Sequence, residues 1–333
     1  MRKLLFVFLC AILSFSSCQH TAGEDERKSA HKTVIIRYDK VLNDYVSYNS
    51  FSALQRLSGD YRKQTRILVE NVLRIGSFKD GNYHLKLQTV YSDSILRHLC
   101  DDVLHKYDKL QEQEKKFDAI FARMKKDIPE VRLPVLYTQI SALNQSVVVE
   151  DSLVGISLDK YMGTDYPLYD RFFHDYQRES MKPERIFPDV MKYYLMSVYP
   201  FPGQEPMTLI NQMIYLGKVY YVTLKLLDLS SVGEMLNYTS DCVKWCEVNQ
   251  AVIWKYMREH NHLDSDEKVL LAKYLDQVPF NEFFGEESPS KLGLWMGMQI
   301  VASYMDTHPD VSYHTLLSGT DYTNFLTEAR FNP

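Results

Sequence analysis

The chain has 333 residues, of which 45% are hydrophobic and 24% are charged, a composition typical of a globular protein. The formal net charge is -5, and no stripe rich in lysine and arginine is interleaved with aromatic residues, so the composition argues against nucleic-acid binding. The length allows one large domain or two smaller domains with a well-buried core.

Residues 1–17 predict a cleaved export signal. Arg2 and Lys3 give a positively charged start, and an apolar stretch follows over residues 4–15. The stretch is about a dozen residues long, whereas a membrane-crossing helix needs roughly twenty. We therefore predict a signal peptide and not a transmembrane anchor.

Cys18 is the predicted lipidation site. Small Ser16 and Ser17 lead directly into it, an order that resembles the bacterial lipobox, after which the signal is removed and the cysteine is acylated. The alternative is an ordinary signal peptide cut nearby, but residues 21–23 (TAG) make a poor small-x-small site. Two or more acyl chains, palmitate among them, hold a protein lastingly to a bilayer. We therefore expect a lipid-anchored protein of the cell envelope.

Residues 18–32 are predicted to form a flexible tether. Gln19 stands where aspartate favours the inner membrane in many Gram-negative lipoproteins, so this resemblance favours the outer membrane. Glu24, Asp25 and Glu26 resemble export tags of some surface lipoproteins, although a solvated linker of this composition is commoner. The sequence therefore does not decide between the periplasmic and the surface-facing leaflet of the membrane.

Residues 33–333 are predicted to form one α+β domain, whose first part, residues 33–130, is helical. Residues 33–37 (TVIIR) fit a short strand, and Asp39 follows as a possible helix cap. Apolar residues recur at helical spacing over residues 61–75 and again over residues 93–127.

The second part, residues 131–333, is predicted to hold a small sheet followed by helices. Short turn-prone links join three β-rich runs at 135–140, 146–149 and 153–158, which predicts an antiparallel meander. Helices are then expected at 183–199, 206–227, 239–260, 265–276 and 289–306. The expected fold is thus a mostly helical α+β fold with one small antiparallel sheet.

Three of the five cysteines are expected to remain as thiols. Cys10 leaves with the signal and Cys18 takes lipid, which leaves Cys100, Cys242 and Cys246. Cys242 and Cys246 stand one helical turn apart and form either a labile redox pair or, as we favour, two small buried hydrophobes.

Known catalytic motifs are absent from the sequence. No histidine is followed by glutamate, so HExxH cannot occur, and neither GxxxxGK[ST] nor GxSxG is matched. His260 and His262, at a helix end, are expected to point to different sides. His98 and His105, with Asp101 and Asp102 between them, supply too few ligands from one helix for structural zinc. We therefore predict no catalytic, cofactor-binding or metal residues.

Aromatic residues make up 13% of the chain and favour either a packed core or a partner surface. Core packing is our expectation for most of them; the residues considered are Tyr166, Tyr169, Trp245, Trp254 and Trp295. Residues 293–297 (GLWMG) permit close approach of a second helix, either as core packing or as the floor of a groove.

A series of sequence blocks in the second half resembles the family of the gliding-motility lipoprotein GldB. The blocks are ISLDKYMG (156–163), IFPDV (186–190), TLINQMIYLGK (208–218), WCEVNQAVIW (245–254), VPF (278–280), SPSKLGLWMGMQIVASYM (288–305) and RFNP (330–333). The resemblance implies a lipid-anchored envelope protein needed for gliding movement and linked with type IX secretion.

The same resemblance implies a fold distantly similar to the zinc peptidases called zincins. In those enzymes the HExxH helix is followed by a later helix whose glutamate completes the metal site. Here Leu216 stands at the glutamate position, and residues 189–195 (DVMKYYL), where the first ligands are expected, hold no histidine. The implied architecture is a degenerate zincin without peptidase chemistry.

The preferred interpretation is a non-enzymatic binding or scaffold component. Its expected partners are the membrane, through the lipidated N-terminus, and other envelope or secretion-machinery proteins. Two alternatives stay open: a metallopeptidase-like hydrolase that uses unrecognised carboxylates, and a surface lipoprotein that captures peptides or glycans.

Overall fold

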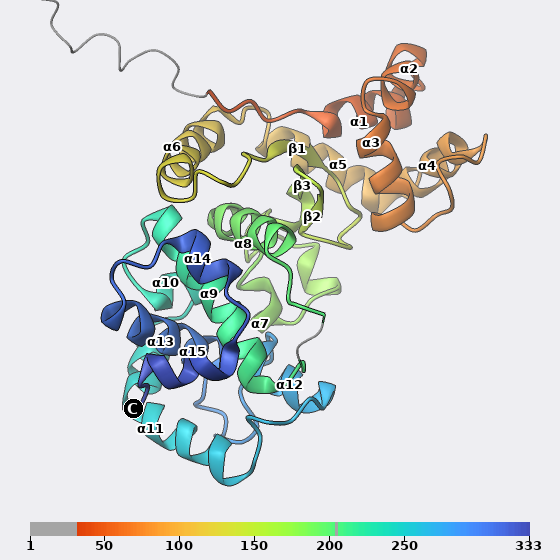
Figure 1. Cartoon of the computed structure of the whole chain (residues 1–333). Helices are drawn as coiled ribbons and strands as arrows, with labels where there is room; N and C mark the ends of the chain where they lie inside the picture. The colour runs from red at the N-terminus through yellow and green to blue at the C-terminus, as the bar shows by residue number, and fades with distance from the viewer. Residues whose placement is uncertain (1–31, 204–205) are drawn as a thin grey trace, which may run out of the picture. The chain divides into compact units, whose positions relative to one another are not determined.

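Helices surround a single three-stranded sheet in the computed structural model, which describes residues 32–203 and 206–333 (Figure 1). The expected mostly helical α+β fold is confirmed. The first part of the chain forms α1 (Tyr38–Tyr48), α2 (Phe51–Ser58), α3 (Arg62–Arg66), the π-helical η2 (Ile67–Val72), α4 (Tyr83–Tyr91), α5 (Ser94–Lys106) and α6 (Gln111–Asp127).

The helix predicted over residues 93–127 is divided into α5 and α6. Asp93 begins α5 by accepting the amides of Ile95 and Leu96, each at 3.0 Å, which satisfies two donors that the first helical turn leaves free. The helix stops after Lys106 because Tyr107 turns inward, where its buried hydroxyl donates to the carbonyl of Tyr161.

The beginning of the domain differs from the prediction. The run at residues 33–37 makes one parallel bridge, Ile36 to Tyr137, and no named strand. Asp39 lies in the first turn of α1 and does not cap it; its buried carboxylate pairs with Arg37 at 2.7 Å and accepts the hydroxyl of Thr138. Asp39, the residue predicted as a cap, therefore links α1 to β1 through its hydrogen bond with Thr138.

The sheet is mixed, and the antiparallel meander predicted for it is wrong. Its strands are β1 (Val135–Gln139), β2 (Val147–Glu150) and β3 (Leu153–Ser157), in the order β1-β3-β2. β2 and β3 form the expected antiparallel hairpin, but β1 pairs with β3 in parallel, with Val135 opposite Leu153.

Buried Asp159 links the ends of the two parallel strands. Its carboxylate accepts the amides of Ser141 and Leu143, at 2.8 and 2.7 Å, and the hydroxyl of Ser141 at 3.0 Å. These bonds hold the connection after β1 beside the residues that follow β3. Burial raises the pKa of Asp159.

The second part holds the remaining helices. They are α7 (Asp175–Arg178), α8 (Ile186–Val198), α9 (Leu209–Leu227), α10 (Val232–Leu236), α11 (Ser240–Glu259), α12 (Lys268–Leu275), α13 (Leu292–Thr307), α14 (Tyr313–Ser318) and α15 (Tyr322–Ala329). The five helices predicted from apolar spacing are confirmed as α8, α9, α11, α12 and α13. Thr208 and Thr239 cap α9 and α11, whereas α14 and α15 were not predicted.

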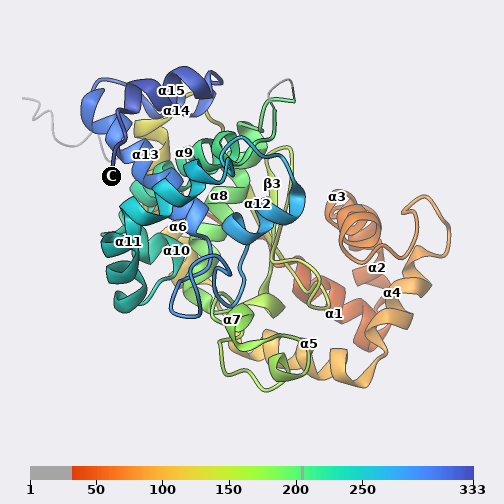
Figure 2. The ribbon, with the colours of Figure 1, turned by 90° about the horizontal axis from the view of Figure 1, so that it is seen from below.

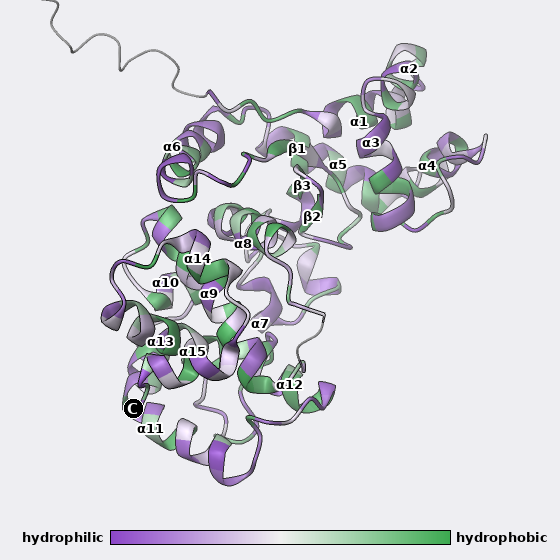
Figure 3. Ribbon diagram, in the orientation of Figure 1, coloured by the Kyte–Doolittle hydropathy of each residue, from purple (hydrophilic) through white to green (hydrophobic). Residues whose placement is uncertain are grey.

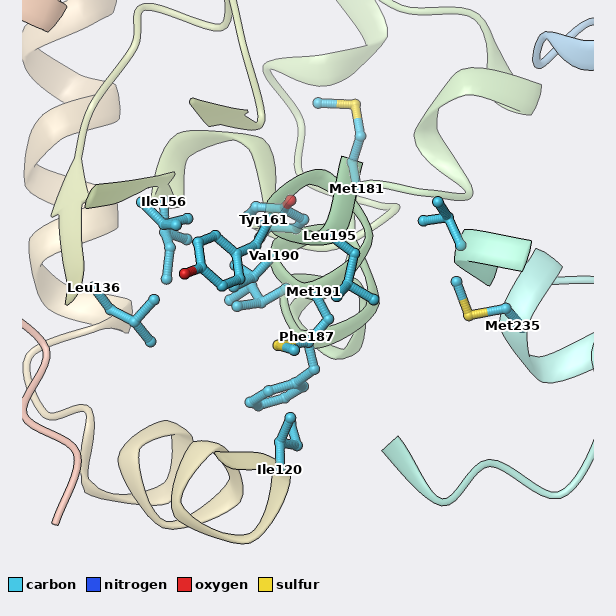
Figure 4. Close-up of a cluster of buried hydrophobic side chains, with 14 of the residues drawn as sticks. Ile120, Leu136, Ile156, Tyr161, Met181, Phe187, Val190, Met191, Leu195 and Met235 are labelled. Atoms are coloured by element: carbon cyan, nitrogen blue, oxygen red, sulfur yellow. The ribbon is translucent and has the colours of Figure 1, made fainter. Parts of the chain in front are cut away.

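α8 covers the sheet. Figure 4 shows Val190 on the side of α8 that faces Leu136 and Ile156 of the sheet, whereas Leu195 lies on the opposite side of the helix; all four are buried. Phe187, in the first turn of α8, points toward Ile120 of α6. Accordingly α8 is largely hydrophobic along its length, whereas α6 is mixed (Figure 3).

α9 and α13 lie side by side and make the closest helix pair (Figure 2). A Cβ atom on Gly217 would lie 2.5 Å from the carbonyl carbon of Gly297, and one on Gly297 would lie 2.8 Å from that of Met213. The close approach predicted for residues 293–297 is therefore confirmed. Tyr169, Trp254 and Trp295 are buried as expected, and Tyr166 and Trp245 pack partly buried against the core.

Buried Lys218 joins α9 to the C-terminal helices. The side chain, 2% exposed, donates to the carbonyl of Gly319 at 3.0 Å and lies 4.1 Å from the ring centre of Phe325. Burial lowers the pKa of Lys218 to about 8, below its ordinary value of 10.5.

We expect the Lys218→Met variant to lose the contribution of Lys218 to stability at alkaline pH. Above pH 8 the folded chain releases the Lys218 proton before the unfolded chain does, so Lys218 makes the slope of the free energy of unfolding against pH more positive, by at most about 2 kcal/mol between pH 8 and 9.5. Urea unfolding at several pH values measures this slope. Equal slopes in both proteins would contradict the assignment.

Candidate functional site

A groove opens between α8, α9 and α12. Its cavity has a volume of about 390 Å³. We call it the α8–α9 groove; its lining residues are Lys192, Tyr193, Met196, Met207, Gln212, Leu216, Tyr220, Lys268, Leu271, Ala272, Leu275, Asp276 and Leu294.

Helical periodicity explains why these side chains converge. Gln212, Leu216 and Tyr220 follow one another at intervals of four residues along α9, so they share a face. Lys268, Leu271, Ala272 and Leu275 show the corresponding spacing on α12. Each helix thus presents one mainly apolar stripe to the groove.

An ion pair lies at the α8 side of the groove. The ammonium of Lys192 is 2.7 Å from one carboxylate oxygen of Asp189, and the hydroxyl of Tyr161 donates to the other at 2.9 Å. The Lys192 ammonium also lies 4.8 Å from the ring centre of Tyr193 and 5.7 Å from that of Tyr220. The charged groups of Lys192 and Asp189 are therefore both engaged with other side chains of the protein.

The pKa values of this pair follow from competing effects. Burial raises the pKa of Asp189, but the charges of Lys192 and Arg185 outweigh it and leave the value below the ordinary one. Burial lowers the pKa of Lys192, yet the Asp189 carboxylate outweighs it and the net shift is upward. The pair therefore stays ionised at neutral pH.

Lys291 adds another cation from the residue before α13. Its backbone is left-handed, with φ 62°, and its ammonium reaches the side-chain oxygen of Gln277 at 3.4 Å. Burial, together with the like charges of Lys192 and Arg185, lowers the pKa of Lys291 to about 8. The charged side chains around α8 therefore include three cations, Arg185, Lys192 and Lys291, and one carboxylate, Asp189.

Sequence reasoning missed this charge cluster, which consists of Arg185, Asp189, Lys192 and Lys291. A signal was available: Arg185, Asp189 and Lys192 stand four and three residues apart, on one helix face, within an otherwise apolar segment. Lys291 is distant in sequence and gave no such signal.

Leu216, the residue at the expected glutamate position, does line the groove. Within residues 32–203 and 206–333, no three His, Cys, Asp or Glu side chains are grouped so that they could hold a metal ion. What the groove offers is apolar contact area beside the Lys192–Asp189 ion pair.

The histidines lie away from this groove. Nε2 of His98 is 3.6 Å from a carboxylate oxygen of Asp102, which also accepts the hydroxyl of Tyr166. His260 and His262 were predicted to point to different sides, and this prediction is wrong. Their rings both contact Tyr256, with centre distances of 3.9 and 5.6 Å, because the chain turns back after α11.

Cys242 and Cys246 both lie on α11 as free thiols, like Cys100. The prediction of two buried thiols is confirmed for Cys246 but not for Cys242, which is half-buried; Cys100 is buried as well. Burial raises the pKa of both Cys100 and Cys246, which keeps these thiols protonated.

The predicted lipidation site, Cys18, lies outside the described residues, as do the signal and almost all of the tether. Among the helices of the described ranges, none combines the length and the apolar character that crossing a bilayer requires.

Comparison with known families identifies the chain. No curated protein and no solved structure matches it. The family described as gliding motility protein GldB, whose model is that of a lipoprotein, matches residues 20–333 and so nearly the whole chain. The chain therefore belongs to the GldB family of gliding-motility lipoproteins of the cell envelope.

Proposed function

We propose that this protein is a lipid-anchored component of the gliding-motility and type IX secretion kind that works by binding other envelope proteins and not by catalysis. Cys18 carries the anchor and the outer membrane is its site. The α8–α9 groove is the binding surface. Family membership supports a role in gliding motility, and the lining of the groove supports binding of other proteins.

The observation that carries the proposal is the chemistry of the groove. Lys192 pairs with Asp189, and Asp189 also accepts the hydroxyl of Tyr161, which leaves Asp276 as the lining carboxylate without an ion-pair partner within 4 Å among the described residues. A general base or nucleophile needs a free lone pair directed at a substrate. Exposed Tyr193 and Met207, 40% and 55% accessible, instead offer apolar contact area at the groove. Aromatic and methionine side chains of this kind are enriched at protein interfaces.

The loss of metal chemistry is part of the proposal. If the fold descends from a zinc peptidase, Leu216 removes the third ligand, because an alkyl side chain has no lone pair to give to zinc. α8 and α9 pack against one another, which is the arrangement that such a site would need.

Metal analysis and a peptidase assay on the purified mature protein separate the proposal from its hydrolase rival. We expect substoichiometric zinc and no turnover of unfolded protein substrates. Stoichiometric zinc together with turnover that a chelator abolishes would overturn the non-catalytic function. The variant Leu216→Glu, which restores one carboxylate to the groove, serves as a comparison for metal uptake.

A further inference from the structure

A second cavity, separate from the α8–α9 groove, lies between α6, the start of α8, the end of α9 and α10. We call it the α6–α10 cavity; its volume is about 640 Å³. This size falls within the range of small-molecule sites, about 300–1,000 Å³. None of its lining residues lines the groove, so an inference from it stands or falls independently of the proposed function.

One part of the cavity wall is apolar. It is formed by Ile120 of α6, Phe187 and Pro188 of α8, and Leu227 and Leu229 at the end of α9. Phe187 and Ile120 point toward one another and are both buried (Figure 4). An apolar body could be desolvated against this wall, which is the main source of affinity in such sites.

The other part of the wall carries four cations: Lys116, Arg123, Lys182 and Arg185. Arg123 already pairs with Asp228 at 2.9 Å. Over the described ranges, neither Lys116 nor Lys182 has an ion-pair partner within 4 Å; the ammonium of Lys116 lies 5.1 Å from the ring centre of Phe187. Two cations at the cavity are thus available to a ligand.

Two carboxylates, Glu184 and Glu234, also line the cavity, against four cations. Glu234 accepts the amide and the hydroxyl of Ser230, at 3.0 and 2.7 Å, and these bonds lower the pKa of Glu234. Glu184 is exposed to solvent. The cavity therefore keeps an excess of positive charge.

Buried Arg185 provides an independent sign of a missing partner. The residue is 7% exposed, and its terminal nitrogens donate to the carbonyls of Glu234 and Met235 at 3.1 and 2.9 Å. Its Nε is buried and, among the described residues, has no acceptor. A buried donor without an acceptor is costly and calls for an explanation.

From these observations we infer that the α6–α10 cavity binds a single-chain anionic amphiphile, with its chain against the apolar wall and its negative head group near Lys116, Lys182 and Arg185. A fatty-acid carboxylate and a phosphate-bearing lipid share this chemistry.

Binding of dodecanoate to the mature chain with Cys18→Ser, free of detergent, tests this inference by titration calorimetry. The substitution removes the predicted acylation site and keeps every described residue. We expect saturable binding of one dodecanoate per chain. Dodecan-1-ol, which lacks the charge, and acetate, which lacks the chain, should each bind at least about 10-fold more weakly. Dodecyl phosphate, compared with dodecanoate, distinguishes the two sources of the head group.

Charge reversal at the cavity rim provides the matched variants. Lys116→Glu combined with Lys182→Glu should weaken dodecanoate binding at least about 10-fold and leave dodecan-1-ol unchanged. Lys125→Glu, on α6 but outside the cavity, should behave as the native chain. Ala119→Trp should fill the cavity and weaken both ligands. The inference is overturned if dodecanoate does not bind, if dodecan-1-ol binds as tightly, or if the double charge reversal has no effect.

Discussion

Replacing Gly297 with alanine is expected to lower the free energy of unfolding by about 3 kcal/mol, a value at the upper end of the cost of overpacking a core. The added Cβ would meet backbone atoms of Met213 on α9, including its carbonyl carbon at 2.8 Å. Backbone cannot rotate away as a side chain can, so α9 and α13 would have to separate.

The sign of this effect is informative. Alanine in a helix interior is favoured over glycine by about 1 kcal/mol, so Gly297→Ala would stabilise the protein if the helices had room for it. Urea unfolding measures the difference. Gly81→Ala, where an added Cβ meets nothing within 4 Å, is the control and should leave stability nearly unchanged.

Gly217→Ala should behave like Gly297→Ala, because its Cβ would lie 2.5 Å from the carbonyl group of Gly297. The double variant should cost less than the sum of the two single variants, since one separation of the helices relieves both clashes. A stabilised Gly297→Ala protein, or strictly additive costs, would contradict the close packing of α9 and α13.

Replacing Cys18 with serine is expected to move most of the protein from the membrane fraction to the soluble fraction. Lasting attachment needs two or more acyl chains, at about 0.8 kcal/mol for each buried methylene, and the variant has no thiol to carry them. Residues 1–17 should be exchanged at the same time for an ordinary cleavable export signal, so that the variant is still processed.

Labelled palmitate and fractionation after an alkaline wash measure this outcome. Cys242→Ser, which changes a half-buried thiol of α11, is the matched control and should stay labelled and membrane-bound. Cys18→Ser protein that still takes up label, or that stays with the membrane after the wash, would contradict the proposed anchor.

Local sequence signals predicted most of the helices. α11 and α12 each bury a stripe of apolar side chains that appears in the sequence as a recurring spacing, whereas α8 and α13 are buried on almost every side and appear as apolar runs. Hydroxyl caps at Thr208 and Thr239 mark two of the starts, because a threonine side chain satisfies amides of the first turn.

Long-range polar contacts could not be predicted in this way. The parallel pairing of β1 with β3 is accompanied by hydrogen bonds from the amides of Ser141 and Leu143 to Asp159, a contact that no spacing rule contains. The charge cluster likewise includes Lys291, which lies about a hundred residues beyond Asp189 in the chain and comes near it only in the folded protein. A groove was one of two alternatives left open for residues 293–297, and the Lys192–Asp189 ion pair was not predicted.

Chemical crosslinking in intact membranes, followed by purification of the protein with its attached partners, tests the binding function most directly. The native chain is compared with a groove variant, Tyr193→Ser with Met207→Ser, and with a control that changes exposed Val248 and Val252 of α11 to serine. We predict that the native chain and the control recover the same subunits of the secretion or motility machinery, and that the groove variant loses them. Recovery of only lipid or glycan with the native chain, or equal recovery of the subunits by all three proteins, would contradict a binding function of the α8–α9 groove.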